Sequence, residues 1–184
     1  MKPLFIVLSL LAVLGAAPAA AGQDAPSPEA NAAFLAANAK KPGTITRPSG
    51  LQYRILRSGT GRRPGGDDVL RISYSVRLVD GRLVESTNPA LPVTIAFNTV
   101  NFAGLAEVLS LMHVGDHWQV FMPANLALGP KGAANGAVPP DQALVFDLTL
   151  ISADPPKPGQ TAGDNPFSVW SNGRENGASF TIRP

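Results

Sequence analysis

Short alternating segments between residues 50 and 152 constrain the fold of this 184-residue chain more than any other feature. Apolar and polar residues alternate in residues 51–59, 69–78 and 143–151, and shorter stretches rich in β-forming residues lie between them. A period of two is typical of half-buried strands. Asp80 and Gly81 directly follow one of these segments and predict a tight hairpin turn. The region therefore predicts an antiparallel sheet.

One segment departs from this period and indicates a helix. Leu105, Val108, Leu109 and Met112 follow the i, i+3, i+4, i+7 spacing of a single helical face, and Gly115 is expected to end the helix. The chain is long enough for one domain with extensions. The prediction is an α+β fold, with an antiparallel β-sheet of about five strands wrapped around one short amphipathic helix.

The N-terminus has the features of a secretory signal peptide. Lys2 precedes an apolar run from Leu4 to Leu14 and an alanine-rich stretch, so residues 1–22 are predicted to be a cleaved signal. The apolar run is shorter than the about 20 residues that a transmembrane helix requires. We therefore expect a periplasmic or secreted protein with no membrane insertion after signal cleavage. The chain contains no cysteine, which excludes disulfides and thiol chemistry.

The segments on either side of the sheet region are predicted to be extensions of one folded domain. Residues 23–48 form a linker with a short helix over residues 28–41, which starts with a proline and ends before a Pro-Gly pair. Residues 49–153 form the domain, and residues 154–184, rich in proline, glycine and asparagine, form a flexible tail. The short helix has too few apolar positions for a specific interface, which predicts a monomer.

Charge and motif content exclude several classes of function. A net charge of +2 with scattered basic residues gives no basis for nucleic-acid binding. The sequence has no phosphate-binding loop, nucleophile elbow or zinc-protease helix. His113 and His117 have the spacing of a weak metal site, but Gly115 interrupts the helix that would align them, so we expect no metal and no cofactor. An apolar pocket is the remaining candidate for a functional site.

Four strings follow one another between Phe34 and Ser152: "FLAANAKKPGTITRPSGLQYRILRSGTGRRP", "LVDGRLVEST", "GLAEVLSLMHVGDHWQVFMPANLALG" and "GAVPPDQALVFDLTLIS". In this order they resemble the FKBP-type peptidyl-prolyl cis-trans isomerases, particularly the exported bacterial macrophage-infectivity-potentiator-like branch. The resemblance implies an FKBP-like domain that rotates X-Pro bonds of unfolded or exported, proline-containing polypeptides. This rotation has a barrier of ~18–20 kcal/mol and needs no nucleophile, in agreement with the absence of catalytic motifs.

The resemblance also assigns residues to the pocket. Tyr74 and Phe146 fall on the family's pocket tyrosine and closing-strand phenylalanine, although both would face the core of any such sheet. Phe102 falls on the residue whose backbone N–H meets a bound carbonyl, and Val138 on an aliphatic wall residue. The residues expected to act in catalysis are Tyr74, Glu85, Phe102, Leu105, Leu128 and Phe146, and those expected to bind substrate are Val84, Val93, Ile95 and Val138.

Several of these positions depart from the family pattern and imply a degenerate pocket. Val84 replaces a phenylalanine, Leu105 replaces the tryptophan of the pocket floor, and Leu128 replaces a tyrosine with a peptide-binding hydroxyl. Glu85 retains the family's carboxylate one methylene further out. Each lost aromatic contact or hydrogen bond is worth roughly 0.5–1.5 kcal/mol, which predicts reduced isomerase activity. The alternatives are a non-catalytic peptide-binding chaperone module using the same pocket, and a structural domain whose ends carry the interactions.

Overall fold

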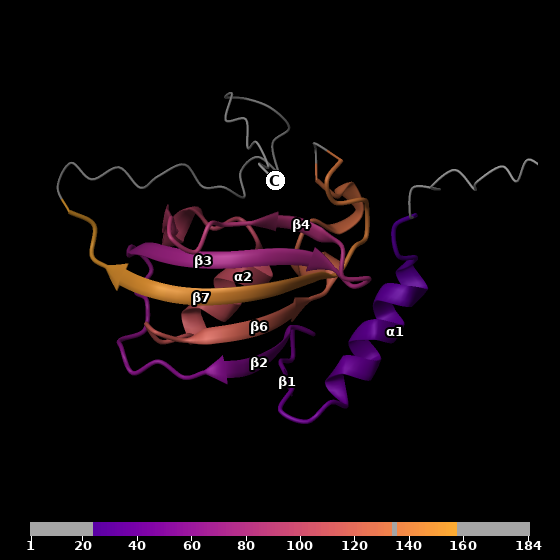
Figure 1. Cartoon of the computed structure of the whole chain (residues 1–184), viewed down its shortest axis with the longest axis horizontal. Coiled ribbons are helices and arrows are strands. Elements are labelled where there is room, and N and C mark those ends of the chain that lie inside the picture. Colours follow the sequence, from indigo (N-terminus) through magenta and orange to yellow (C-terminus); the bar gives the residue numbers. More distant parts are fainter. Residues whose placement is uncertain (1–23, 134–135, 158–184) are drawn as a thin grey trace, which may run out of the picture.

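The computed structural model describes residues 24–133 and 136–157, so the predicted signal peptide and the tail beyond residue 157 lie outside the described residues. In this part of the chain seven strands form one antiparallel sheet, α2 lies against one face of the sheet, and α1 lies beside one end (Figure 1). The strands are β1 (Ile45–Thr46), β2 (Gln52–Arg57), β3 (Val69–Leu78), β4 (Leu83–Ser86), β5 (Val93–Ala96), β6 (His117–Met122) and β7 (Leu144–Asp154).

The ten-residue strand β3 organises the sheet. One edge of β3 pairs with β7 along its whole length, and the other edge pairs with β5 at residues 69–72 and with β4 at residues 75–77. The sheet order is β1-β2-β6-β7-β3-β4, with β5 also on β3. The α+β class and the antiparallel sheet are confirmed. The strand number exceeds the predicted value of about five partly because β1, with only two residues, has no period that the sequence could reveal.

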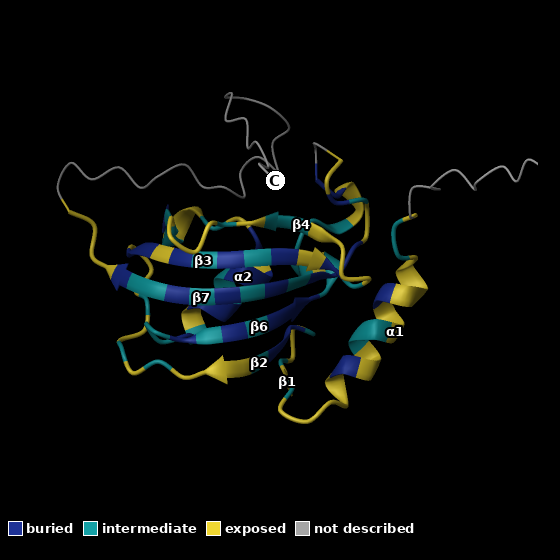
Figure 2. Cartoon of the chain, viewed as in Figure 1, coloured by how far each residue is buried: buried dark blue, intermediate teal, exposed yellow. Residues whose placement is uncertain are grey.

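Burial in β3 and β7 follows their alternating sequences (Figure 2). The alternation shifts once, because Arg71 pairs with Ser152 while Ile72 pairs with Leu150, which leaves Ile151 as the extra residue of a bulge. The inward side chains pack under α2 and build the core. They are Leu70, Ile72, Tyr74, Val76 and Leu78 of β3, and Leu144, Phe146, Leu148 and Leu150 of β7.

The helix α2 (Ala103–Leu111) presents the predicted face to this core. Leu105, Val108, Leu109 and Met112 are all 0% exposed. Burial of each such side chain contributes about 1.5–3 kcal/mol, so this stripe accounts for much of the attraction between helix and sheet.

The end of α2 differs from the predicted end at Gly115. The helix stops at Leu111, and the backbone of Met112 is already extended, with ψ of 153°. The buried carboxylate of Asp116 accepts a hydrogen bond of 2.6 Å from the backbone N–H of His113. This bond fixes residues 113–116 as a separate turn, and Gly115 serves that turn with φ of +96°.

The predicted N-terminal helix is present as α1 (Pro28–Ala39) and is attached to the domain. The ring of Phe34 lies 6.0 Å, centroid to centroid, from that of Phe121 on β6. The two buried side chains of α1 are both amides, Asn31 and Asn38. The attachment therefore depends on hydrogen bonds more than on an apolar stripe.

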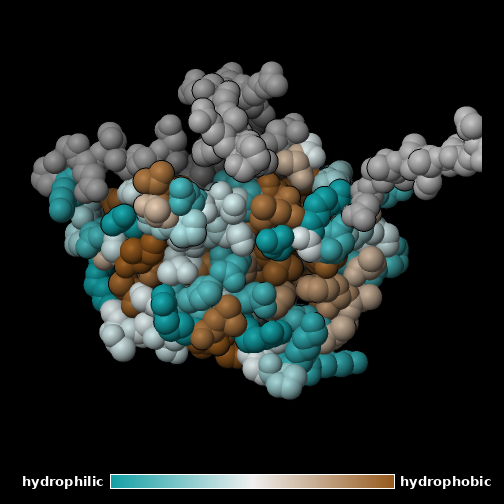
Figure 3. Space-filling model, viewed as in Figure 1, coloured by the Kyte–Doolittle hydropathy of each residue, from teal (hydrophilic) through white to brown (hydrophobic). Residues whose placement is uncertain are grey.

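The sheet face seen in Figure 3 mixes polar and apolar side chains and shows no continuous apolar band. On β3 and β7, Arg77 is exposed and Ser73 and Thr149 are half-buried. Among residues 24–133 and 136–157, no helix has the length and apolar character needed to cross a membrane.

Candidate active site

Tyr74, Phe146 and Glu85 form the centre of the candidate site. Tyr74 on β3 pairs with Leu148 on β7, so the rings of Tyr74 and Phe146 are diagonal neighbours on one face of adjacent strands. Their centroids are 6.4 Å apart and the rings are tilted by 45°. The Tyr74 hydroxyl donates a hydrogen bond of 2.6 Å to Oε1 of Glu85 on β4. Adjacent strands thus place a phenol, a carboxylate and an aromatic face together.

Burial keeps the Tyr74 hydroxyl protonated. Tyr74 is 3% exposed. Removal from water, followed by the negative charge of Glu85 and the hydrogen bond to it, raises the pKa of Tyr74 far above its ordinary value. The backbone of Tyr74 is fixed by Thr87, whose N–H donates to the Tyr74 carbonyl at 2.9 Å and whose Oγ1 accepts from the Tyr74 N–H at 2.9 Å. The phenol is therefore a well-positioned hydrogen-bond donor at neutral pH.

Four further residues predicted for the site lie in the core below this centre. Phe102, Leu105, Ile95 and Val138 are each no more than 2% exposed and belong to the apolar cluster that contains both rings. Leu105, on the first turn of α2, stands where the resemblance places a tryptophan floor. Because its side chain is wholly covered, the floor is filled by core packing and presents no flat ring at the surface.

A hollow of about 250 Å³ opens beside these residues. It is smaller than most pockets for drug-sized ligands, which span roughly 300–1,000 Å³. Phe102, directly before α2, and Leu128, directly before the 3-10 turn Gly129–Lys131, form part of its wall. The full lining is Asn101, Phe102, Ala127, Leu128, Lys131 and Gly132.

The remaining predicted residues, Val84 on β4 and Val93 on β5, are half-buried and pack against the same cluster. All nine apolar residues predicted for the site belong to or pack against the single core cluster of the domain, which also contains Tyr53 and Trp118, and Glu85 is joined to it through Tyr74. Of the predicted residues, only Phe102 and Leu128 line the hollow. The sequence did not single out Lys131 or Gly132. They lie in a loop, where no hydrophobic period marks a residue as part of a pocket.

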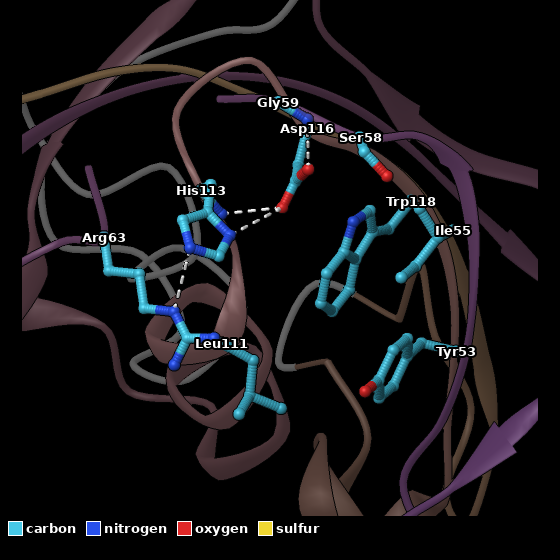
Figure 4. Close-up of a pocket in the computed structure, with 9 residues that line it drawn as sticks. All are labelled: Tyr53, Ile55, Ser58, Gly59, Arg63, Leu111, His113, Asp116 and Trp118. Carbon is cyan, nitrogen blue, oxygen red and sulfur yellow. Dashed lines mark hydrogen bonds and ion pairs between the residues drawn. The ribbon is translucent and has the colours of Figure 1, made fainter. Parts of the chain in front are cut away.

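A second hollow of about 380 Å³ lies between β2, β6 and the end of α2, and Figure 4 shows it in close-up. One wall is the stacked pair Tyr53 and Trp118, with centroids 4.4 Å apart. On the opposite side Arg63 donates a 3.2 Å hydrogen bond to His113. The hollow shares no residue with the predicted prolyl site. Its full lining is Tyr53, Ile55, Ser58, Gly59, Arg63, Leu111, His113, Asp116 and Trp118.

His113 and His117 have separate surroundings. His113 faces Arg63 and Asp116 in the turn after α2 (Figure 4), whereas Nε2 of His117 on β6 lies 2.6 Å from Oδ1 of Asp147 on β7. In the described part of the chain, no group of three or more histidine, cysteine, aspartate or glutamate side chains is arranged to hold a metal ion. Each histidine is used in a local pair.

Comparison with known proteins finds two matching family regions in the chain. Residues 60–151 match the family described as FKBP-type peptidyl-prolyl cis-trans isomerase, and residues 16–55 match the domain amino-terminal to it. The outer membrane protein MIP of Legionella longbeachae is 44% identical over 65% of this chain and 51% of its own length. The peptidyl-prolyl cis-trans isomerase Mip of Coxiella burnetii is 38% identical over 67% of this chain and 54% of its own length. The chain spans about half the length of these relatives.

Solved structures share the fold. A peptidyl-prolyl cis-trans isomerase of Pseudomonas syringae superposes with a TM-score of 0.64 at 29% identity, and the superposition covers 72% of this chain and 99% of the Pseudomonas syringae chain. FkpA of Escherichia coli superposes with a TM-score of 0.63 at 27% identity and covers 68% of this chain and 58% of that one. The matched family region contains most of the sheet, α2 and the site residues. The chain therefore belongs to the family of FKBP-type peptidyl-prolyl cis-trans isomerases.

Proposed function

We propose that this protein catalyses cis/trans isomerisation of X-Pro bonds at a site centred on Tyr74, Glu85 and Phe146, next to the hollow that Phe102 and Leu128 line. The observation that carries the proposal is the 2.6 Å hydrogen bond between the Tyr74 hydroxyl and Glu85, set against an aromatic ring in an otherwise apolar cluster. A structural core does not need such a polar pair.

The mechanism follows from the peptide bond itself. Partial double-bond character produces the barrier, and an apolar environment disfavours the charge-separated resonance form that creates this character. The ring of Phe146 within the apolar cluster supplies that environment, and Val138 contacts the peptide equally in both isomers and in the twisted state. The N-terminus of α2, beginning after Phe102, supplies a partial positive charge that favours a carbonyl oxygen. The Tyr74 hydroxyl and Glu85 orient the peptide, and no covalent intermediate forms.

We expect turnover below that of a typical family member. Leu105 and Leu128 offer only carbon atoms where the family pattern has a tryptophan and a tyrosine, and Val84 offers a smaller wall than phenylalanine. Losses of roughly 0.5–1.5 kcal/mol at each position sum to one or more factors of ten in rate, since about 1.4 kcal/mol corresponds to tenfold.

A protease-coupled assay with a prolyl tetrapeptide tests the proposal on the mature chain. Tyr74→Phe removes the hydroxyl and is expected to lower kcat/KM by about three- to tenfold. The other tyrosine, Tyr53, lies in the second hollow, so Tyr53→Phe is the matched control and should leave turnover unchanged. Equal effects of the two variants would reject the assigned site.

The second candidate is a peptide-binding chaperone module without turnover. It is favoured by Leu128, which lines the hollow with an aliphatic side chain and no hydrogen-bonding group. Such a module would suppress aggregation of an unfolded, proline-containing protein while leaving the tetrapeptide at its uncatalysed rate. Measurement of both properties on the same preparation separates the two functions.

We further propose that the protein acts as a monomer after export to the periplasm or the medium. The signal-like composition of residues 1–22 supports the export, and the name of the Legionella longbeachae relative contains the words outer membrane protein. Sedimentation of the mature chain should give a monomer mass. Retention of the full-length chain in the cytoplasm would contradict the location.

A further inference from the structure

The attachment of α1 to the domain is unusual in its chemistry. The buried side chains of this helix are Asn31 and Asn38, seven residues apart and therefore on the same face. Figure 2 shows α1 as an otherwise largely exposed helix beside one end of the sheet. A buried amide is stable only when its polar atoms are hydrogen-bonded, so the two asparagines fix where the helix can sit.

Both the nitrogen and the oxygen of the Asn31 side-chain amide form hydrogen bonds. Its Nδ2 donates to the carbonyl of Ser27 at 2.9 Å, to that of Pro26 at 3.2 Å and to Oε1 of Gln142 at 3.3 Å. Its Oδ1 accepts a 2.9 Å hydrogen bond from the backbone N–H of Ala143. The helix thus binds both the side chain and the backbone of the segment just before β7.

Gln142 completes this set of hydrogen bonds. Its Nε2 donates to the carbonyls of Pro26 and Pro140, each at 3.0 Å. Both Asn31 and Gln142 are no more than 5% exposed. We call this group of residues the amide clasp: Pro26, Ser27, Asn31, Pro140, Gln142 and Ala143.

The amide clasp lies next to the proposed prolyl site in the chain. Val138, the aliphatic wall residue, precedes Pro140 by two positions, and Phe146 follows Ala143 by three. The other end of this segment is held by its own loop, because the N–H of Ala133 donates to the carbonyl of Val138 at 2.8 Å. The N–H of Asp141 also donates to the carbonyl of Gly129 at 2.9 Å. Residues 138–143 are therefore held by their own loop at Val138 and Asp141, and by α1 at Gln142 and Ala143.

We propose that Asn31 is a positioning residue for the prolyl pocket: together with Gln142 it holds residues 140–143 and so limits the movement of Val138. This inference rests on the proposed isomerase function. It assigns to the N-terminal helix a role in substrate affinity: displacement of α1 releases the Ala143 N–H and lets the wall at Val138 move.

Asn38 offers a matched control on the same helix. Its Nδ2 donates to Oε1 of Gln52 on β2 at 2.9 Å, and its Oδ1 accepts from Arg54 at 3.3 Å. It is as buried as Asn31, at 1% against 5% exposed. Its partners lie on a strand separated from β7 by β6, outside the pocket.

The experiment compares Asn31→Ala, Asn38→Ala and Gln142→Ala in the mature chain. The two helix variants should lower the melting temperature by similar amounts, since each removes a buried amide. Asn31→Ala and Gln142→Ala should raise KM for a prolyl tetrapeptide by about tenfold with kcat nearly unchanged, because the wall contacts ground state and transition state alike. Asn38→Ala should change KM by less than about twofold.

Amide hydrogen exchange separates this inference from the proposed function. Asn31→Ala should accelerate exchange at Ala143, whose N–H donates to Asn31, and at Ala133, whose N–H donates to the carbonyl of Val138, whereas Asn38→Ala should not. This readout does not depend on turnover by the protein. If exchange behaves as expected but no variant or parent isomerises the peptide, the isomerase proposal fails and the positioning of the loop stands. Unchanged exchange at both amides in Asn31→Ala and Gln142→Ala, or equal rises in KM for Asn31→Ala and Asn38→Ala, would overturn the inference.

Discussion

Replacement of Gly132 by alanine should distort the wall of the proposed pocket. Gly132 has φ of 62° and ψ of −161°, a conformation that is essentially restricted to glycine. A Cβ atom at this position would overlap the carbonyl oxygen of Val138 and lie 2.7 Å from the carbonyl carbon of Pro139. These are backbone atoms of the loop, so the loop itself must shift.

Two terms set the magnitude. The backbone conformation costs about 1–3 kcal/mol for a residue with a Cβ atom. Displacement of a packed segment adds about 1–3 kcal/mol, as for other overpacked sites. We therefore expect Gly132→Ala to lower the free energy of unfolding by about 2–6 kcal/mol. Because the displaced atoms belong to Val138, binding of prolyl peptides should weaken as well.

Gly129→Ala is the matched control. Gly129 also has a positive φ, of 57°, but a Cβ atom there would meet nothing closer than the carbonyl oxygen of Ala124 at 4.0 Å, so only the backbone term of about 1–2 kcal/mol applies. Urea unfolding followed by circular dichroism gives both stabilities, and titration with a prolyl peptide gives both affinities. Equal losses in the two variants would refute the argument that the loop backbone at Val138 abuts Gly132.

Three further predictions concern the pocket, the Arg62–Asp68 ion pair and the Tyr74 phenol. Leu105→Trp combined with Leu128→Tyr should raise the turnover of a prolyl peptide. The melting temperature of this variant should fall, since overpacking costs about 1–3 kcal/mol. Unchanged turnover in a folded variant would count against the pocket assignment. The hydrogen bond from Arg62 lowers the pKa of Asp68, so this carboxylate stabilises the fold above its ordinary pKa near 3.8 and the contribution disappears on acidification. Asp68→Asn should lower the free energy of unfolding by about 1.5 kcal/mol at pH 7 and flatten the dependence of stability on acid pH. An unchanged acid-unfolding profile would contradict the pairing. The raised pKa of Tyr74 means that stability present below about pH 10 is lost at higher pH. Tyr74→Phe should therefore unfold at a higher alkaline pH than the parent, and unfolding of both proteins at the same pH would contradict burial of the phenol.

The sequence predicted those parts of the fold that depend on hydrophobic period. The face of α2 and the inward side chains of β3 and β7 are as expected, because burial of apolar area determines both the pattern and the packing. The attachment of α1 was not predicted. Its buried residues Asn31 and Asn38 are amides. The sequence alone does not distinguish an asparagine that is buried and hydrogen-bonded from one that remains exposed to water.

The sequence also did not predict where α2 ends. Gly115 was expected to end α2, but the helix ends at Leu111 because the carboxylate of Asp116 binds the N–H of His113. Such a bond depends on Asp116 being buried beside Gly59, a residue far away in the chain. Similarly, Gly132 joins the pocket through a backbone conformation, and glycine in a loop does not by itself indicate which turn it serves.

The Tyr74–Glu85 pair is the feature that best separates a prolyl site from a core that merely keeps the shape of one. Leu105 shows that the fold tolerates an aliphatic residue at a site position, since its side chain is completely packed. By the same logic, phenylalanine at 74 with an apolar residue at 85 would satisfy the core, because replacing both partners of a hydrogen bond by apolar groups is nearly neutral. Burial of the Tyr74 phenol beside the half-buried Glu85 instead requires desolvation of the phenol and partial desolvation of the carboxylate. Folding therefore accounts for the ring of Tyr74 but not for its hydroxyl, and recognition of a peptide accounts for both.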